Sequence, residues 1–437
     1  MKILPSLSGA NWSDSAYRRS DLRERILQFG TGMLLRALCA ASVDAANRAG
    51  RLAGRIVVVQ STPHGNARAL NAQDGLFTLV ERGLENGERV ERTRLIGAVS
   101  RALVAETEWD AVREIAARPE VQVIVSNVTE AGFQIDSGFP ARLTDALHAR
   151  FESCPDGPHL FVIPTELVPD NGPRLAAMVD ELASRTARAE AFRHWLSSHV
   201  RFCSSLVDRI TTGVPPANER PALDARLGYT DALLTVAEPY HFWAIEGDPA
   251  ALRNAFPIDL QPESVVFAPD IGFYEERKLR LLNATHTAVT PVALLAGVRT
   301  VREAMDHPRL GAFLRRILFD EIIPATDLPA DAAAQFAHSV IERFCNPWLD
   351  HQWRTIATNQ EPKMRIRVEP VIVASTNRRR RAPEGLALAC AAHLTFLRVP
   401  MDTLSEASRL PDFVAAVARW STVIAHEGME GALAQCT

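Results

Sequence analysis

Three runs rich in β-branched residues constrain the fold of this chain most. They occupy residues 55–62 (RIVVVQST), 121–128 (VQVIVSNV) and 159–165 (HLFVIPT). Between the first two, residues 108–118 (EWDAVREIAAR) carry the 3.6-residue apolar spacing of a helix. Fully apolar strands separated by helices are typical of a parallel sheet with right-handed crossovers. The first part of the chain is therefore predicted to be an α/β domain.

A Gly-Thr-Gly sequence follows another apolar run, residues 26–29, and leads into a helix-like pattern. This order suits a pyrophosphate at a helix N-terminus, because Gly30 can make the tight turn and Gly32 lets the backbone approach the phosphates. The third glycine of the usual fingerprint is missing, and Leu35 and Arg36 occupy that region. An ordinary strand-to-helix turn is the alternative. Arg36 would then lie near a phosphate or be solvated.

Ligands of parallel sheets gather at the carboxyl ends of the strands. An acidic residue normally ends the second strand of an NAD site and binds the ribose, but here Gln60 and Ser61 stand in that place. His64 and Arg68 could contact a 2′-phosphate or belong to a solvated turn, so the residues leave NAD and NADP both open. The candidate cofactor residues at the strand ends are Gly30, Gly32, Arg36, Gln60, Ser126, Asn127 and Thr129, with Glu130 beside them.

Composition limits the partners of this protein. Its 437 residues exceed what one core usually supports, so two domains are expected. A net charge of -4 gives no reason to expect nucleic acid or an anionic membrane. The six cysteines lack disulfide or zinc spacing, so no metal is predicted. No segment approaches the ~20 apolar residues of a membrane span. A reduced cytoplasm is the simplest compartment, and the basic run Arg378–Arg381 is interpreted as a solvated loop.

The second part of the chain is predicted to be mostly helical. Residues 365–375 resemble a strand, but Pro370 weakens that interpretation. We therefore expect a Rossmann-like dinucleotide-binding domain over residues 1–272 and a helical substrate and catalytic domain over 273–437. The segments with 3.6-residue apolar spacing are 276–318, 331–357 and 400–433.

The sequence KLRLLNATH, residues 278–286, places Lys278, Asn283 and His286 in one predicted helix. Residues five and eight positions after the first lie ~140° and ~80° from it around a 3.6-residue helix, so all three can share a broad face. Together they can handle a ketone or alcohol without a metal: the lysine moves a proton, the amide donates to the oxygen and the imidazole holds the lysine. An amphipathic helix with a polar face is the alternative.

Eight segments, in order along the chain, together resemble the mannitol dehydrogenase family of long-chain polyol and hexuronate dehydrogenases. The LNATHT and VERGLENG sequences are most similar to the tagaturonate reductases of that family. The resemblance implies hydride transfer between NAD(H) and an open-chain hexuronate, reducing tagaturonate to altronate reversibly. The segments carrying it are residues 28–37, 70–87, 125–133, 204–210, 237–247, 282–297, 319–324 and 343–348.

The resemblance also implies roles for individual residues. Lys278 matches the catalytic general acid/base, Asn283 the oxygen-binding asparagine and His286 the histidine that orients the lysine. Arg277 and Arg280 are close enough in sequence to help lower the pKa of Lys278.

A hexuronate carries a carboxylate, which calls for a cation near the substrate. Lys363 aligns with a family lysine, and Arg367 follows it in the same segment; both are predicted to bind substrate, with surface charges as the alternative. Glu130 and Asn346 are further substrate-binding candidates.

One departure from the family pattern concerns an oxyanion donor. Polyol-oxidising relatives carry an asparagine where Leu167 stands here, within residues 164–172. Asn171 matches the Asn-Gly sequence that follows in the family and could be structural. The departure argues against simple mannitol dehydrogenase activity.

Alternatives remain at this stage. The same chemistry could act on fructuronate and mannonate or on a neutral polyol, and a catalytically silent dinucleotide-binding protein is a third reading. NAD is the expected cofactor, with NADP not excluded. The expected partner is a small molecule, and the protein is expected to be a monomer or homodimer.

Overall fold

The computed structural model describes residues 21–129, 132–135, 138–186, 188–261 and 263–436. The chain folds into two compact units. The first, the sheet unit, contains the residues up to Arg82 together with Glu91–Ile271. The second, the helical unit, contains Gly83–Val90 and the residues from Gly272 onward. No sequence pattern had separated residues 83–90 from their neighbours.

The sheet unit is built around a six-stranded sheet in the order β5-β2-β1-β6-β7-β8, and each pair of neighbours is parallel. The chain moves to one side of β1 for β2 and β5 and to the other side for β6, β7 and β8, so a topological switch point lies between β1 and β6. The predicted parallel α/β fold is confirmed. The strands are β1 (Arg23–Phe29), β2 (Gly54–Gln60), β5 (Val99–Val104), β6 (Val123–Ser126), β7 (Leu160–Pro164) and β8 (Val200–Phe202).

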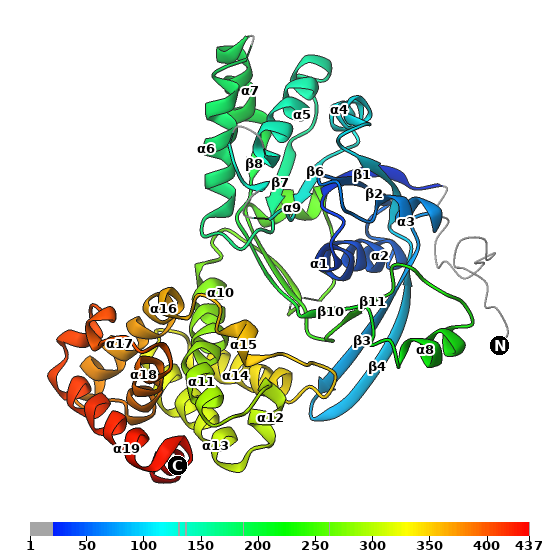
Figure 1. The fold of residues 1–437 in the computed structure, drawn as a ribbon. Coiled ribbons are helices and arrows are strands. Elements are labelled where there is room, and N and C mark those ends of the chain that lie inside the picture. The colour runs from blue at the N-terminus through cyan, green and yellow to red at the C-terminus, as the bar shows by residue number, and fades with distance from the viewer. Residues whose placement is uncertain (1–20, 130–131, 136–137, 187, 262, 437) are drawn as a thin grey trace. The chain divides into compact units, whose positions relative to one another are not determined.

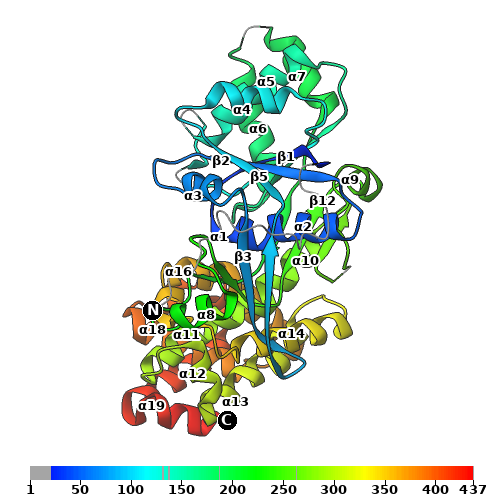
Figure 2. The same ribbon diagram turned by 90° about the vertical axis from the view of Figure 1, so that its right-hand side faces the viewer.

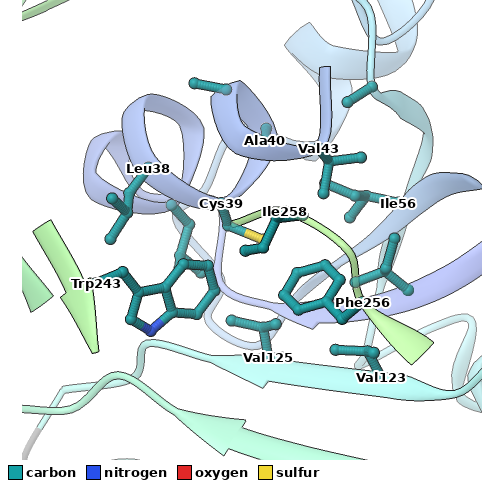
Figure 3. Packing of buried hydrophobic residues seen from close by; sticks show 14 of the residues in the cluster. Leu38, Cys39, Ala40, Val43, Ile56, Val123, Val125, Trp243, Phe256 and Ile258 are labelled. Carbon is teal, nitrogen blue, oxygen red and sulfur yellow. The ribbon is translucent and has the colours of Figure 1, made fainter. Parts of the chain in front are cut away.

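Helices cover both faces of this sheet, as Figure 2 shows for α2 on one side and α4 to α7 on the other. The period of two along each strand divides the core: Ile56 packs into the cluster with α2, whereas Val57 packs into the cluster with α4 to α7. Cys39, Val123 and Trp243 belong to the first cluster, in which the Trp243 and Phe256 rings meet edge-on at 6.0 Å between centroids (Figure 3). The helices are α1 (Met33–Leu35), η2 (Arg36–Ala40), α2 (Ala41–Arg48), α3 (Ala67–Ala72), α4 (Trp109–Ala117), α5 (Phe139–Ser153), α6 (Asn171–Ala183), α7 (Ala189–His199), α8 (Arg220–Leu227) and α9 (Pro249–Ala255).

Two further sheets, in the orders β10-β11-β3-β4 and β13-β12-β9, were not predicted. A buried ion pair joins them: Arg209 Nη2 donates to Glu81 Oε1 at 2.5 Å and to the backbone oxygen of Glu238 at 2.9 Å. Arg209 in segment 204–210 and Glu238 in segment 237–247 therefore serve the fold. The strands are β3 (Phe77–Glu85), β4 (Glu88–Ile96), β9 (Ser205–Asp208), β10 (Thr211–Gly213), β11 (Thr235–Ala237), β12 (Phe242–Glu246) and β13 (Val265–Ala268).

The helical unit matches the predicted mostly helical second part, and α18 packs against α11 and α19 in it (Figure 1). The tip of the β3–β4 hairpin joins this unit, where Gly87 N donates to Glu342 Oε1 at 2.5 Å. Its helices are α10 (Gly272–Arg277), η4 (Lys278–Ala284), α11 (Thr285–Leu295), α12 (Val301–Asp306), α13 (Pro308–Arg316), η5 (Ile317–Ile322), η6 (Ile323–Ala325), α14 (Ala330–Phe344), α15 (Trp353–Ile356), α16 (Gln360–Lys363), η7 (Met364–Val368), α17 (Glu369–Arg379), α18 (Glu384–Leu397), η8 (Met401–Thr403), η9 (Ala407–Arg409) and α19 (Pro411–Cys436).

Pro370 had weakened the strand interpretation of residues 365–375, and the structure agrees. These residues are helical, since Pro370 occupies the first turn of α17, where no backbone N–H is needed. The apolar spacing over 331–357 belongs to two helices, α14 and α15. One expectation needs correction: Arg378 and Arg379 lie in the last turn of α17 and not in a loop, and Arg378 donates to the Thr326 carbonyl at 2.8 Å. Among the described residues, no helix has both the length and the apolar character needed to cross a membrane.

Candidate active site

The Gly-Thr-Gly loop follows β1 and has the backbone geometry that a phosphate site needs. Gly30 has a φ of +121°, and a Cβ there would lie 2.8 Å from the Asn127 carbonyl oxygen, so only glycine fits. A Cβ on Gly32 would meet nothing within 4 Å. Gly32 precedes α1, and the segments α1, η2 and α2 run without a break to Arg48. The backbone of Gly32 therefore stands open at a helix N-terminus, which fits a pyrophosphate.

Arg36 is buried rather than solvated. Its Nη1 donates to the Thr31 carbonyl at 2.7 Å and its Nε to Thr235 Oγ1 at 3.0 Å. Burial lowers the pKa of Arg36 to about 10. The guanidinium thus holds the glycine loop in place, and a direct contact with phosphate stays a prediction.

Gln60 ends β2, and its amide is occupied by the turn that follows. Its Nε2 donates to the Thr62 carbonyl at 2.9 Å, and its Oε1 accepts from Ala67 N at 3.0 Å. His64 and Arg68, in and just after this turn, are exposed. A role for Gln60 in binding ribose stays a prediction, but these bonds give the residue a local structural role.

The ends of β6 and β7 are joined by side-chain bonds. Asn127 Nδ2 donates to Thr165 Oγ1 at 3.0 Å, and Ser126 Oγ donates to Glu166 Oε2 at 3.1 Å. Glu166 also accepts from Val128 N at 2.9 Å, yet burial raises the pKa of this carboxyl. The carboxylate of Glu166 therefore fixes the switch-point loop.

The remaining sheet-unit candidates lie around this loop. Thr129 is exposed, and its Oγ1 accepts from Gly132 N at 3.3 Å. Glu130 lies outside the described residues. Leu167, at the position of the missing asparagine, is 80% exposed. Asn171 is structural, since its Nδ2 donates to the Ser205 carbonyl at 2.9 Å.

Lys278 and Asn283 lie at the two ends of a π-helical stretch, η4, and not in the α-helix that their spacing predicted. In a π-helix the backbone bonds join residues five apart. Residues 278 and 283 are therefore stacked one turn apart along the helix, instead of ~140° apart around it. A π-helical backbone therefore brings these two positions closer in direction than the predicted α-helix would. Both are partly buried.

His286 follows on α11 and is only 7% exposed. Its ring stacks on Phe344 at 4.3 Å between centroids and meets His351 edge-on at 5.2 Å. Within the described part of the chain, His286 Nε2 has no hydrogen-bond partner. Burial, followed by His351 and three cations, holds the pKa of this imidazole well below its usual value. The His286 imidazole therefore resists protonation, and its Nε2 is buried without a hydrogen-bond partner among the described residues.

Pro291 explains how α16, which is distant from α11 in sequence, is attached to it. Proline has no backbone N–H, so the Thr287 carbonyl four residues earlier loses its helical partner. Gln360 Nε2 donates to that carbonyl at 2.8 Å instead. Thr287 Oγ1 in turn donates to the Asn283 carbonyl at 2.8 Å and accepts from Arg367 Nη1 at 3.4 Å. Thr287 thus connects the oxygen-binding candidate with a carboxylate-binding candidate.

The two predicted cations lie where α16 continues into η7. Lys363 Nζ donates to the Ile356 carbonyl at 3.0 Å. Burial and the nearby Arg367 lower the pKa of Lys363. Arg280 Nη1 donates to the carbonyls of Ile366 at 2.8 Å and Arg367 at 3.1 Å. Arg280 therefore ties η4 to η7.

Asn346 serves the turn after α14. It is 1% exposed, and its Oδ1 accepts from Trp348 N at 3.0 Å. A contact between this side chain and a substrate stays a prediction.

Sequence reasoning missed four residues that the structure brings to this cluster: Thr287, Arg343, His351 and Gln360. Thr287 and Arg343 stood inside motifs that had already been singled out, LNATHT and RFCNPW. His351 and Gln360 had no such signal. Among the described residues, no group of three or more His, Cys, Asp and Glu side chains is arranged to hold a metal.

Family models cover both units. The mannitol dehydrogenase Rossmann domain matches residues 24–256, and the mannitol dehydrogenase C-terminal domain matches residues 270–437. The chain belongs to the mannitol dehydrogenase family. It is an oxidoreductase of that family, with the predicted motifs in their expected order.

Relatives and solved structures of this mannitol dehydrogenase family member agree on the fold. An altronate oxidoreductase of Klebsiella pneumoniae subsp. pneumoniae is 39% identical over 413 residues, 92% of this chain and 85% of the relative. That of Escherichia coli O139:H28 is 39% identical over 388 residues, 86% of this chain and 80% of the relative. The structure of Pseudomonas fluorescens mannitol 2-dehydrogenase with NAD and D-mannitol matches with a TM-score of 0.73 and 24% identity, covering 96% of each chain. A substrate-free D-sorbitol dehydrogenase matches with a TM-score of 0.81 and 22% identity, again covering 96% of each.

Proposed function

We propose that this protein interconverts tagaturonate and altronate with NAD(H) as cofactor. The observation that carries the proposal is the set of cationic groups around His286, close in the fold to Lys278 and Asn283. Such a set suits a substrate with a carboxylate better than a neutral polyol. The two altronate oxidoreductases described above, each 39% identical, support the same substrate.

Lys278 and Asn283 carry the chemistry in this proposal. In the reductive direction the ketone oxygen of tagaturonate accepts a hydrogen bond from the Asn283 amide while negative charge develops on it. Lys278 then gives its proton to that oxygen, and the oxidative direction reverses both roles. Bound NADH supplies the hydride that the carbonyl carbon receives. The products are altronate and NAD+, which balances one hydride and one proton.

His286 has a positioning role. A neutral imidazole can accept a hydrogen bond through a buried nitrogen without adding a second positive charge beside Lys278. Its unpartnered Nε2 and its depressed pKa both suit that role. We infer that His286 orients the amine of Lys278 and that the enzyme would be inactive with His286 protonated.

The sheet unit has a suitable place for the dinucleotide. The open side of Gly32 and the left-handed Gly30 fit a pyrophosphate at the start of α1. Ser126, Asn127 and Thr129 would lie along the nicotinamide half, at the switch point. Gln60 offers no carboxylate to repel a 2′-phosphate, so preference for NAD over NADP stays a prediction.

Lys363 and Arg367 are the proposed carboxylate ligands. They lie four residues apart on consecutive turns, and burial lowers the pKa of both. Bringing a carboxylate between them would offset that cost of burying positive charge. The absent asparagine at Leu167 leaves Asn283 as the proposed amide donor to the oxygen.

Substrate profiling tests the function directly. Purified protein is assayed at the nicotinamide absorbance band with tagaturonate, fructuronate and fructose, each with NADH and NADPH. We expect tagaturonate with NADH to give the highest kcat/KM. Higher kcat/KM with fructose would reject the carboxylate proposal, and higher kcat/KM with fructuronate would move the assignment to mannonate.

The cell compartment and oligomeric state are also predictions. We expect a cytoplasmic enzyme that is a monomer or homodimer. Size-exclusion chromatography with light scattering tests the second expectation.

A further inference from the structure

A second histidine stands beside His286. The His351 ring lies edge-on to it, with centroids 5.2 Å apart and planes at 81°. His351 is only partly buried. Arg343, 6% exposed, immediately precedes Phe344, whose ring stacks on His286. Two groups to which the sequence analysis gave no role therefore act on the same imidazole.

The backbone around His351 is held by pairing with another segment. The His351 carbonyl accepts from Val301 N at 3.0 Å, and Trp353 N donates to the Arg299 carbonyl at 3.0 Å. Between them, Gln352 forms an antiparallel bridge with Thr300. His351 is not part of a helix, yet these backbone bonds fix the position of its imidazole.

Three of the groups that act on His286 are cationic, namely Arg343, Arg367 and Lys363. Burial first, and then His351, Arg343, Arg367 and Lys363, depress the pKa of His286. Burial and Arg343 lower the pKa of His351 as well. Burial is the largest cause for both histidines, and the neighbouring cations add to it. An anion bound among them would reverse that effect.

We propose that His351, together with Arg343, binds the carboxylate of the substrate beside Lys363 and Arg367, and that His351 is a specificity-determining residue for acidic over neutral sugars. The inference rests on the proposed function, since it assumes that hexuronates are substrates. An imidazole N–H donates one directed hydrogen bond, and a guanidinium supplies fixed positive charge. The pair therefore adds direction and charge to the two cations on α16 and η7.

Replacing His351 by Phe tests the proposal. Phe keeps an aromatic ring against His286 and removes the N–H donor. We expect KM for tagaturonate to rise about tenfold with kcat changed less than about threefold. KM for fructose should stay the same, so the ratio of the two kcat/KM values should fall about tenfold. Calorimetry should show a matching rise in the Kd of altronate.

A matched control is His338→Phe, the same change on α14, at an exposed histidine that contacts Phe319 at 5.2 Å. It should leave both KM values unchanged. A second pair of variants, Arg343→Lys and Arg343→Met, separates charge from packing, since Lys keeps the charge. The ratio of kcat/KM for tagaturonate to kcat/KM for fructose should fall further in the Met variant than in the Lys variant. The comparison is made between variants of equal melting temperature, or after correction for the fraction of folded protein.

The outcomes distinguish the two proposals. If the unaltered enzyme prefers hexuronates but His351→Phe keeps the substrate ratio and altronate Kd, the role of His351 is overturned and the proposed function stands. If the unaltered enzyme prefers fructose and mannitol, both are overturned. A fall in kcat alone for both substrates would assign His351 to packing and also reject the inference.

Discussion

Near the carboxyl ends of β1, β2 and β6 the side chains of Arg36, Gln60 and Asn127 bond within the sheet unit, whereas near His286 three buried side-chain atoms have no partner among the described residues. Gln60 and Arg36 each donate to a backbone carbonyl within a few residues. In the helical unit His286 Nε2, Trp353 Nε1 and Gln360 Oε1 are buried without partners among the described residues. The contrast indicates two ways of binding: open backbone for a phosphate at the glycine loop, and side-chain groups for the substrate.

The same contrast explains why the glycine-loop motif predicts its backbone geometry well, whereas the motif around His286 predicts few of the side chains that surround it. A loop that binds through its backbone requires glycines, and its side chains are available for holding the loop. A site that binds through side chains gathers them from several helices, here α11, α14 and η7. Burying these polar side chains without hydrogen-bond partners costs free energy, and a bound ligand offsets that cost.

The largest expected effect comes from Lys278→Ala. Removing the proton donor should lower kcat by about 10²–10⁴-fold, because general acid/base catalysis contributes that much. The Kd of NADH, measured by calorimetry, should change little, since the glycine loop belongs to the other unit. Arg299→Ala, an exposed residue of the helical unit, is the control. Turnover near normal in the Lys278 variant would remove the proposed proton transfer.

His393→Leu tests the buried polarity of the helical unit through pH. His393 is fully buried on α18, neither ring nitrogen has a partner in the described part of the chain, and burial lowers its pKa to about 4. The unfolded chain therefore binds a proton more readily than the folded one. As pH falls from about 6.5 to about 4, this histidine should reduce the free energy of unfolding by about 3 kcal/mol.

The Leu variant should lose that dependence, so its advantage over the unaltered protein should grow toward low pH in denaturant titrations. His426→Leu makes the same change at an exposed position of α19 and should show no such trend. Parallel stability curves for His393→Leu and the unaltered protein would contradict the argument.

Gln60→Ala tests whether this amide serves the sheet unit. The change leaves the Thr62 carbonyl and the Ala67 amide without their partner, which should cost about 2 kcal/mol of unfolding free energy. The Kd of NADH should rise because the turn after β2 loosens. Unchanged stability with weaker NADH binding would instead make Gln60 a direct cofactor ligand.

Gly32→Ala has the smallest expected effect and separates binding from folding. Its φ of −67° suits alanine, and open space surrounds the new methyl group. Melting temperature should stay unchanged while the Kd of NADH rises at least about tenfold, about 1.4 kcal/mol. Gly30→Ala, in contrast, should also destabilise the fold, because of its φ of +121° and the nearby Asn127 carbonyl. Normal NADH affinity in Gly32→Ala would place the pyrophosphate elsewhere.

The parallel sheet could be predicted because its signals are local. Val57 and Val59 lie in a run of apolar residues that only a strand covered on both faces accommodates, and Gly30 stands where the backbone needs a positive φ. The helical second unit could be predicted for the same reason. The β3–β4 hairpin and the small sheets were missed, because their strands carry charges that pair with residues distant in sequence, such as Glu81 with Arg209.

The sequence by itself determined the residue types of the chemistry: Lys278, Asn283 and His286, and a glycine loop after β1. Only the tertiary structure decided that η4 is π-helical and that Arg343 and His351 border His286. It also assigned the amides of Gln60 and Gln360 to backbone carbonyls. The physical reason is range. Propensity and period act over a few residues, whereas burial, charge and hydrogen-bond satisfaction depend on helices that the chain brings together from far apart.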